Sequence, residues 1–418
     1  MKLKLGFIPL TDCAPLVIAK EKGLFDKYQL DVELVKEASW ANIRDKVATG
    51  ALDGAQMLAT MPIAATLGIG GITTPMLTAM IMDLNGNAIT IANVLYDRIQ
   101  ALAPETLQQR PITAAGIKAV IDANKKTGGE RLRFAMVFPT STHNYELRYW
   151  LASAGIDPDR DIELMVIPPS QMVENLASGN IDGFCVGEPW NGLAVKRGLG
   201  HTLITKYELW NNSPEKVFGV TQAWAEQNPD THKTILKALV EATQWLDANE
   251  ANRLEAVNIL SRTEYVDIDV DVIKMSMTGS FYYNRDDAPT PMEDFNVFHR
   301  YSANFPWLSH AVWFLTQMVR WGHIREPLDI NKTAESIYRP DIFRQVMQDM
   351  GQPYPLIDYK EEGKHTGPWI LEEGNGGIDM GADTFFDNKP FQADNLFDYL
   401  DGLSIKHLAF DLQALRSV

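Results

Sequence analysis

A pattern that occurs twice along the chain is the feature that most constrains its fold. Residues 5–58 and 134–186 each run through a strand, a polar loop, a helix, a second strand and a second helix. Both copies end in similar sequence segments, VATGALDGAQM at residues 47–57 and NLASGNIDGFCV at residues 175–186. The repeat predicts two α/β lobes that face each other with matching loops. Two such lobes can close over a small solute.

The length and the charge of the chain limit the classes of protein to which it can belong. At 418 residues the chain is long enough for two lobes with separate cores. The formal net charge of -16 argues against nucleic acid as a partner, and it means that a bound anion needs a local cation. Cys13 and Cys185 lack metal-site spacing and are expected to be small buried residues. The sequence predicts no metal and no cofactor.

The segments between and after the copies predict where the chain changes lobe. LNGNAIT at residues 84–90 is polar at its centre and strand-like at both ends, which is typical of a crossover strand or hinge. We therefore predict lobe one at residues 1–85 and 222–330, and lobe two at residues 86–221. The aromatic-rich residues 331–418 are expected to form a C-terminal extension packed on a lobe.

The second copy contains a candidate anion site at the start of a predicted helix. Thr140, Ser141 and Thr142 precede that helix, whose free N–H groups and positive dipole end suit an anion. The hydroxyl groups could equally serve only to cap the helix. His143 at the same position can donate hydrogen bonds to an anion, although a capping or surface role would also explain it.

Four residues outside that helix complete the candidate site. Trp40 lies in a polar loop, where its flat indole suits a flat ligand, with packing on a neighbouring helix as the alternative. Gln56 and Gly187 lie where the last strand of each copy reaches the cleft of such folds. Lys216 can supply positive charge, although most lysines are merely solvated. Glu188 is expected to pair with a lysine or arginine, because it would repel an anion.

Seven segments together resemble the periplasmic nitrate-binding proteins of ABC-type nitrate/nitrite uptake systems. They are FIPLTDCAPLVIAKEKGLF, EASWANIRDKV, LDGAQML, DLNGNAIT, FPTSTHNYELRYWLA, GEPWN and YRPDIF. The resemblance covers nearly the whole chain. It implies a two-lobed, type II periplasmic binding protein-like α/β fold with the ligand in the cleft between the lobes. It also implies that the anion is held by Trp40, by Gln56 or neighbouring polar groups, by His143 and by Lys216.

The chemistry of these residues predicts that the ligand is nitrate, with nitrite bound as well. Nitrate accepts hydrogen bonds without donating any, so a cation and N–H donors suit it. The resemblance implies delivery of the anion to the permease subunits of an ABC transporter. The same branch holds bicarbonate-binding proteins, which have a carboxylate near the lysine position. Glu215 beside Lys216 keeps that alternative open.

The cellular location and the mode of action have alternatives of their own. Residues 1–4 lead directly into the first strand without a signal peptide. This fits a removed leader, which could also have carried a membrane anchor, or a cytoplasmic nitrate sensor that signals by closing. We predict a periplasmic protein, because the tail resembles that of the transport proteins. We do not predict an enzyme, because no nucleophile, base and orienting group occur together, although pyrimidine-precursor synthases share the fold.

Overall fold

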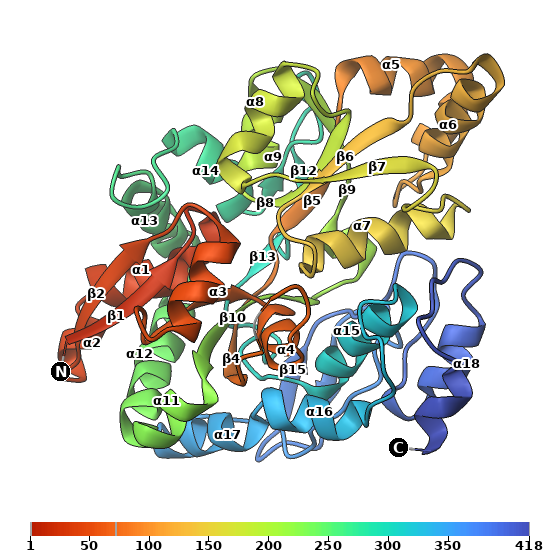
Figure 1. The fold of residues 1–418 in the computed structure, drawn as a ribbon. Helices are drawn as coiled ribbons and strands as arrows, with labels where there is room; N and C mark the ends of the chain where they lie inside the picture. Colours follow the sequence, from red (N-terminus) through yellow and green to blue (C-terminus); the bar gives the residue numbers. More distant parts are fainter. Residues whose placement is uncertain (1, 72, 418) are drawn as a thin grey trace.

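The computed structural model describes residues 2–71 and 73–417 and contains two main β-sheets with helices around them (Figure 1). The larger sheet has the order β13-β4-β10-β3-β1-β2. Its strands are β1 (Lys2–Phe7), β2 (Asp31–Lys36), β3 (Gly54–Leu58), β4 (Met76–Asn85), β10 (Pro214–Thr221) and β13 (Asn296–Val297). The smaller sheet has the order β7-β6-β8-β5-β9. Its strands are β5 (Asn87–Ala92), β6 (Leu132–Met136), β7 (Ile162–Val166), β8 (Gly183–Gly187) and β9 (Gly200–Thr205).

The two sheets contain the doubled sequence pattern in the same spatial arrangement. β1 lies between β2 and β3 and pairs parallel with both, and β6 lies between β7 and β8 in the same way. The next strand in each sheet runs antiparallel, with β10 beside β3 and β5 beside β8. The sequence repeat is therefore a repeat of topology. We call the half built on the larger sheet lobe one and the half built on the smaller sheet lobe two.

The chain first passes from the larger sheet to the smaller one at Gly86, and it returns between β9 and β10. β4 ends at Asn85 and β5 begins at Asn87, and both Asn85 and Gly86 have left-handed backbone angles, with φ of 65° and 80°. A side chain on Gly86 would lie 3.2 Å from Asp83 Oδ2. The predicted crossover is therefore two strands in different sheets, because these two residues turn the chain between them.

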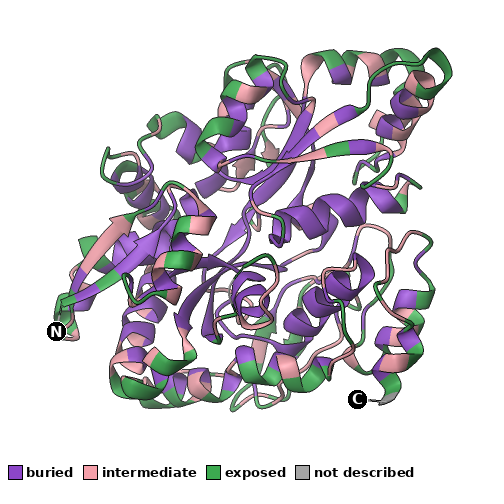
Figure 2. Ribbon diagram, in the orientation of Figure 1, coloured by how far each residue is buried: buried purple, intermediate pink, exposed green. Residues whose placement is uncertain are grey.

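The helices surround the sheets, and two of them are buried along nearly their whole length. Figure 2 shows α7 and α15 as buried ribbons, and a helix that is buried on all sides lies inside a molecule. The N-terminal helices are α1 (Ala14–Glu21), α2 (Leu24–Lys27), α3 (Trp40–Ala48), α4 (Met61–Thr66), α5 (Asn93–Leu102), α6 (Ala115–Thr127), α7 (Thr142–Ser153), α8 (Met172–Ala177), α9 (Trp190–Lys196) and α10 (Lys206–Leu209). The later helices are α11 (Gln222–Gln227), α12 (Pro229–Asp247), α13 (Glu250–Leu260), α14 (Val270–Met277), α15 (Leu308–Arg320), α16 (Ile330–Ile337), α17 (Pro340–Asp349) and α18 (Leu396–Asp401). Within residues 2–71 and 73–417, no helix combines the length and the apolar character that crossing a membrane requires.

The C-terminal part of the chain contacts both lobes. It includes the hairpin of β14 (Trp369–Leu371) and β15 (Ile378–Met380). Tyr338 Oη donates a hydrogen bond of 2.7 Å to the Ala59 carbonyl in lobe one. Phe385 stacks on Trp210, which follows α10, with ring centroids 4.7 Å apart. The extension was predicted to pack on one lobe, whereas these contacts join it to both.

Candidate anion site between the lobes

Lys216 lies in a buried group of charged side chains where the two lobes meet. It is on β10, where it pairs with Leu58 of β3 and with Asp83 of β4. The pairing with β4 changes register on both sides of Lys216. In a regular strand, neighbouring side chains point to opposite faces, but an irregularity can redirect one of them. Glu215 Oε1 therefore lies only 2.6 Å from Lys216 Nζ, and neither residue has exposed surface.

Trp40 and His143, which come from different copies of the repeat, both lie beside this pair. The Trp40 ring centroid is 5.5 Å from Lys216 Nζ. His143 Nε2 is 3.0 Å from Glu215 Oε1, the oxygen that also contacts Lys216. The structure thus brings together three of the six predicted site residues, one each from α3, α7 and β10.

Helix caps place two of these side chains. Ser39 Oγ accepts a backbone hydrogen bond of 3.2 Å and caps α3, so Trp40 is the first helical residue and not part of a polar loop. Ser141 Oγ accepts a backbone hydrogen bond of 3.0 Å and caps α7, whose second residue is His143. The capping role predicted for the Thr140–Thr142 stretch therefore belongs to Ser141, which leaves the flanking threonine hydroxyl groups for other partners.

Several polar atoms around Lys216 are buried without a hydrogen bond. Among the described residues, Trp40 Nε1, the hydroxyl groups of Thr140 and Thr142, and His143 Nδ1 have no hydrogen-bond partner, and His143 Nε2 has only its contact with Glu215 Oε1. Leaving a buried polar group unpaired costs about 1–3 kcal/mol. Burial lowers the pKa of His143 to about 3, so its ring is neutral at pH 7 and one nitrogen donates a hydrogen bond. These groups could be satisfied by a small ligand that accepts hydrogen bonds.

Gln56 contacts Asp12, a residue of the first polar loop, and Gly187 lies beside that residue. The Gln56 amide is used at both ends, because Oε1 accepts from the Ile8 N–H at 2.9 Å and Nε2 donates to Asp12 Oδ1. A side chain on Gly187 would lie 3.3 Å from Asp12 Oδ2. The same oxygen is 2.7 Å from Lys216 Nζ. Direct contact of Gln56 and Gly187 with a ligand stays a prediction.

A second buried lysine extends the charged group into lobe two. Lys206 Nζ is 2.7 Å from Glu215 Oε2 and also contacts Glu146 of α7. Asn87 of β5 donates to Glu146 and to Glu215, at 3.0 and 2.9 Å. Sequence reasoning did not place these residues in the site. A signal was present, because ionisable side chains inside otherwise apolar strands and helices need partners.

The charge states of Glu215 and Lys216 follow from the charged groups around them. Burial raises the pKa of Glu215, but Lys206 and Lys216 outweigh it and hold the pKa below its ordinary value. Burial lowers the pKa of Lys216, but Asp12 and Glu215 outweigh it and hold the pKa above its ordinary value. Glu215 is therefore a carboxylate and Lys216 an ammonium at neutral pH.

The prediction that Glu188 pairs with a lysine or arginine is wrong. Its Oε2 accepts the Gly192 N–H at 3.0 Å, while Oε1 has no partner among the described residues. Burial raises the pKa of Glu188 to about 7. Its backbone carbonyl accepts the Thr11 N–H at 2.8 Å, which links the lobes. Below pH 7 the carboxyl group of Glu188 is therefore mainly protonated, and a protonated carboxyl group can be buried without a cation.

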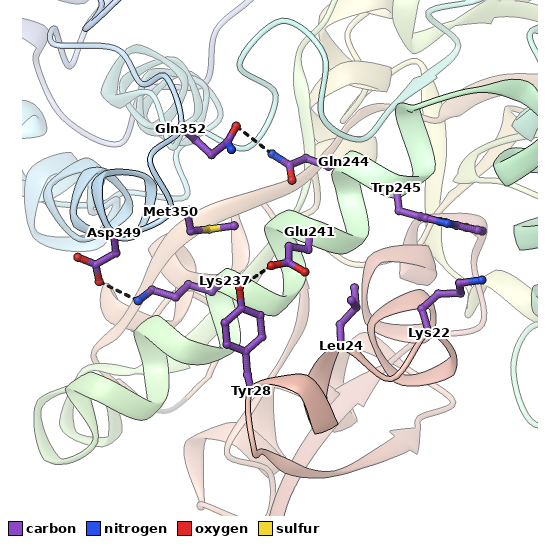
Figure 3. A pocket seen from close by; sticks show the side chains of 10 residues that line it. All are labelled: Lys22, Leu24, Tyr28, Lys237, Glu241, Gln244, Trp245, Asp349, Met350 and Gln352. Carbon is purple, nitrogen blue, oxygen red and sulfur yellow. Dashed lines mark hydrogen bonds and ion pairs between the residues drawn. The ribbon is translucent and has the colours of Figure 1, made fainter.

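A large surface pocket lies elsewhere on lobe one. Its volume is about 580 Å³. Figure 3 shows its lining side chains, which come from α2, α12, α17 and adjoining residues. Its side chains pair with one another, as Lys237 does with Asp349 at 2.8 Å. None of the six predicted site residues lines this pocket. Its cations are partly exposed, so it lacks the dry surroundings of Lys216.

The cysteines behave as predicted. Cys13 and Cys185 are both free thiols and both are buried. Cys185 lies on β8 and Cys13 in the turn before α1.

Comparisons with known proteins agree with the fold and with the family resemblance. The chain matches the NMT1-like family over residues 1–261. The nitrate/nitrite binding protein NrtA of Synechococcus elongatus is 37% identical over 416 residues, which cover 96% of this chain and 86% of that protein. The nitrate import ATP-binding protein NrtC of Synechocystis sp. is 44% identical over 358 residues, or 84% of this chain. The chain spans only 51% of that relative's length.

The chain is also similar to a bicarbonate transport protein and to a protein of known crystal structure. The bicarbonate transport ATP-binding protein CmpC of Synechocystis sp. is 39% identical over 370 residues, 86% of this chain and 53% of that protein. The crystal structure of the periplasmic nitrate-binding protein NrtA from Synechocystis PCC 6803 matches with a TM-score of 0.84 and 33% identity, over 97% of this chain and 98% of that one. The predicted two-lobed binding-protein fold is confirmed. The chain belongs to the NMT1-like family and is a relative of the NrtA solute-binding proteins.

Proposed function

We propose that this protein captures nitrate, and also nitrite, for an ABC transporter by closing its two lobes over the anion. The observation that carries the proposal is a buried lysine among unpaired hydrogen-bond donors. Lys216 has no exposed surface, and beside it Trp40 Nε1 and His143 Nδ1 have no hydrogen-bond partner among the described residues. Nitrate is flat, has one negative charge and only accepts hydrogen bonds, so it matches this set.

The names of the relatives support the same ligand and the same system. NrtA is a nitrate/nitrite binding protein, and NrtC is an ATP-binding protein of nitrate import. We infer that the present protein is periplasmic, reaches that compartment through a leader that could also anchor it, and hands the anion to permease subunits. The lobes that we propose to close are lobe one, built on the larger sheet, and lobe two, built on the smaller sheet. Because β10 (Pro214–Thr221) is a strand of the larger sheet, the proposed boundary between the lobes lies before residue 214 and not at the predicted residue 221.

Isothermal titration calorimetry tests the ligand directly. Sodium nitrate and sodium nitrite, added to the full chain at pH 6, are expected to bind with 1:1 stoichiometry. Chloride at the same ionic strength serves as a control for nonspecific charge effects. Heat with bicarbonate and none with nitrate would overturn the proposal. A Trp40→Phe variant, which keeps a flat ring but removes the indole N–H, is expected to bind nitrate more weakly than the wild type.

Bicarbonate is a second candidate because two carboxylates face the lysine. Asp12 Oδ2 and Glu215 Oε1 lie 2.7 and 2.6 Å from Lys216 Nζ. Bicarbonate carries an O–H group that needs an acceptor, and an ionised carboxylate supplies one. Titration with bicarbonate at pH 8, in a solution depleted of nitrate, measures this alternative. Binding tighter than that of nitrate at the same pH would favour it.

A further inference from the structure

The two charged groups that contact Lys216 most closely are both carboxylates. Asp12 Oδ2 lies 2.7 Å and Glu215 Oε1 lies 2.6 Å from its Nζ. All three residues are fully buried. An anion that approaches the ammonium therefore meets two oxygen atoms of like charge in surroundings without bulk water, where such repulsion is weakly screened.

The buried group has excess negative charge before any anion enters. Three carboxylates, those of Asp12, Glu146 and Glu215, face two ammonium groups, those of Lys206 and Lys216, and each residue is at most 1% exposed. With all five ionised, the group carries one net negative charge. A bound nitrate would add a second negative charge, unless one carboxylate took up a proton.

We propose that Asp12 is a further ligand-contacting residue, which takes up one proton from solvent when the anion binds and donates its new O–H to an anion oxygen. The inference rests on the proposed function. Asp12 is the better placed of the two carboxylates next to Lys216, because Glu215 is also held by Lys206 and Asn87. Among the described residues, the partners of the Asp12 carboxyl group are Lys216 and the Gln56 amide.

The protonation behaviour of Asp12 fits this role. Burial raises the pKa of Asp12 to about 6, although Lys216 opposes the shift. At pH 7.5 the unliganded carboxyl group is therefore mainly ionised, and an anion beside it would raise its pKa further. Neutral Asp12 has an O–H donor where ionised Asp12 has only acceptors. The proton thus removes a repulsion and adds a hydrogen bond.

The other titratable groups that face Asp12 keep one charge state near neutral pH. Burial raises the pKa of Asp83 on β4 and of the adjacent Cys13 thiol well above their ordinary values. Burial lowers the pKa of His143 on α7 to about 3. On β10, Glu215 stays ionised and Lys216 stays protonated, as shown above. Asp12 is therefore the group of this set whose protonation changes most easily.

The number of protons also separates the two candidate ligands. Nitrate brings no proton, so Asp12 must obtain one from solvent. Bicarbonate carries its own O–H group, which could donate a hydrogen bond to the ionised carboxylate of Asp12. Proton uptake is therefore expected for nitrate and not for bicarbonate.

Calorimetry on the full chain measures the proton directly. Sodium nitrate is titrated at pH 7.5 in HEPES and in Tris, which release different heats when they give up a proton. We expect close to one proton taken up per nitrate.

The Kd for nitrate is expected to be constant below about pH 5.5 and to rise by up to about tenfold per pH unit above pH 7. Binding with no buffer dependence would overturn the inference and leave the proposed function standing. Absence of nitrate binding at pH 6 would overturn the proposed function itself.

Two variants assign the proton to a residue. Asp12→Asn offers an amide N–H in place of the acid O–H, so it is expected to bind nitrate with no proton uptake and with a Kd independent of pH. Glu188→Gln is the matched control, because burial raises the pKa of Glu188 to about 7 outside the Lys216 group. The control is expected to keep the wild-type uptake. Uptake lost in Glu188→Gln and kept in Asp12→Asn would overturn the assignment.

Discussion

Lys216 is the residue whose loss should most weaken anion binding. The Lys216→Ala variant leaves Asp12 and Glu215 facing the ligand without the cation that lay within 2.7 Å of both. Removing one partner of a desolvated charged contact costs roughly 2 kcal/mol or more, so we expect the Kd for nitrate to rise by at least about tenfold. Isothermal titration at pH 6 measures the change.

Lys360→Ala provides a matched control for this prediction. Lys360 is a partly buried lysine with 7% of its side chain exposed, and it contacts Glu362 in the C-terminal extension. Its loss should destabilise the fold in a similar way without touching the anion. An equal loss of affinity in both variants, or none in Lys216→Ala, would show that Lys216 does not hold the ligand.

Individual residue types revealed part of the site but not its charge balance. Trp40, His143 and Lys216 could be predicted because each has a chemistry that stands out in its local sequence. The role of Asp12 depends on Lys216 and Gln56, which are far away in the sequence and meet it only in the folded sheet. A single sequence does not show which distant charges become neighbours.

At the scale of elements, two neighbouring residues at the start of α7 are expected to affect different properties. Ser141 should affect the stability of the fold, and Thr140 should affect the binding of nitrate. Ser141 caps the helix, whereas the Thr140 hydroxyl is buried and has no hydrogen-bond partner in the described part of the chain. We expect Ser141→Ala to lower the free energy of unfolding by about 1 kcal/mol. Thr140→Val should leave that free energy unchanged or raise it, because it removes an unpaired buried polar group, but it should weaken nitrate binding.

Urea unfolding and nitrate titration of both variants check this separation. Ser141→Ala serves as the control for binding, because its hydroxyl already has a partner in the helix cap. If Thr140→Val binds nitrate as tightly as the wild type, its hydroxyl is not a ligand contact.

Elements with strong sequence patterns were predicted well, and those that depend on the other lobe were not. The helix predicted to follow the Thr140–Thr142 stretch is α7 (Thr142–Ser153), and the capping residues at its start are visible in the sequence. The crossover predicted at residues 84–90 proved to be the ends of two strands in different sheets, because the turn at Gly86 serves a connection between sheets that no local pattern describes.

For the whole molecule, Glu188 makes stability depend on pH. Its pKa is about 7 in the folded protein, above its ordinary value of 4.5. The folded state therefore binds the proton more tightly. This contribution to stability is complete below pH 4.5 and is lost as the pH rises through 7, by on the order of 3 kcal/mol. Glu188→Gln removes the dependence, so its free energy of unfolding should increase relative to wild type between pH 5 and pH 8.

Urea denaturation of the wild type and of Glu188→Gln at pH 5 and at pH 8 tests whether the free energy of unfolding changes in this direction. The comparison uses the difference between variant and wild type, because Asp12 contributes a decline of the same direction in both. A difference that stays constant with pH would mean that Glu188 is ionised in the folded state.

The closed arrangement of the lobes should control how fast the anion leaves. Lys216 and His143 have no exposed surface, so a bound anion can escape only when the lobes separate. Thr60 Oγ1 of lobe one donates a buried hydrogen bond to the Thr140 carbonyl of lobe two. Thr60→Val removes this link with little change of shape. A hydrogen bond contributes about 1 kcal/mol, and such changes appear mainly in dissociation, so we expect the dissociation rate of nitrate to rise by about fivefold.

Stopped-flow fluorescence, with Trp40 at the site as the reporter, measures that rate after dilution of the nitrate complex. Thr66→Val is the control, because Thr66 Oγ1 donates to the Met76 carbonyl at 3.2 Å and accepts the Met76 N–H at 2.9 Å, both within lobe one. It loses these two hydrogen bonds without affecting the contact between lobes, and its dissociation rate should equal that of the wild type. If both variants release nitrate at the wild-type rate, the Thr60 link does not hold the lobes closed. If both accelerate release equally, loosening of lobe one is sufficient, and the opening of the cleft is not controlled at this contact.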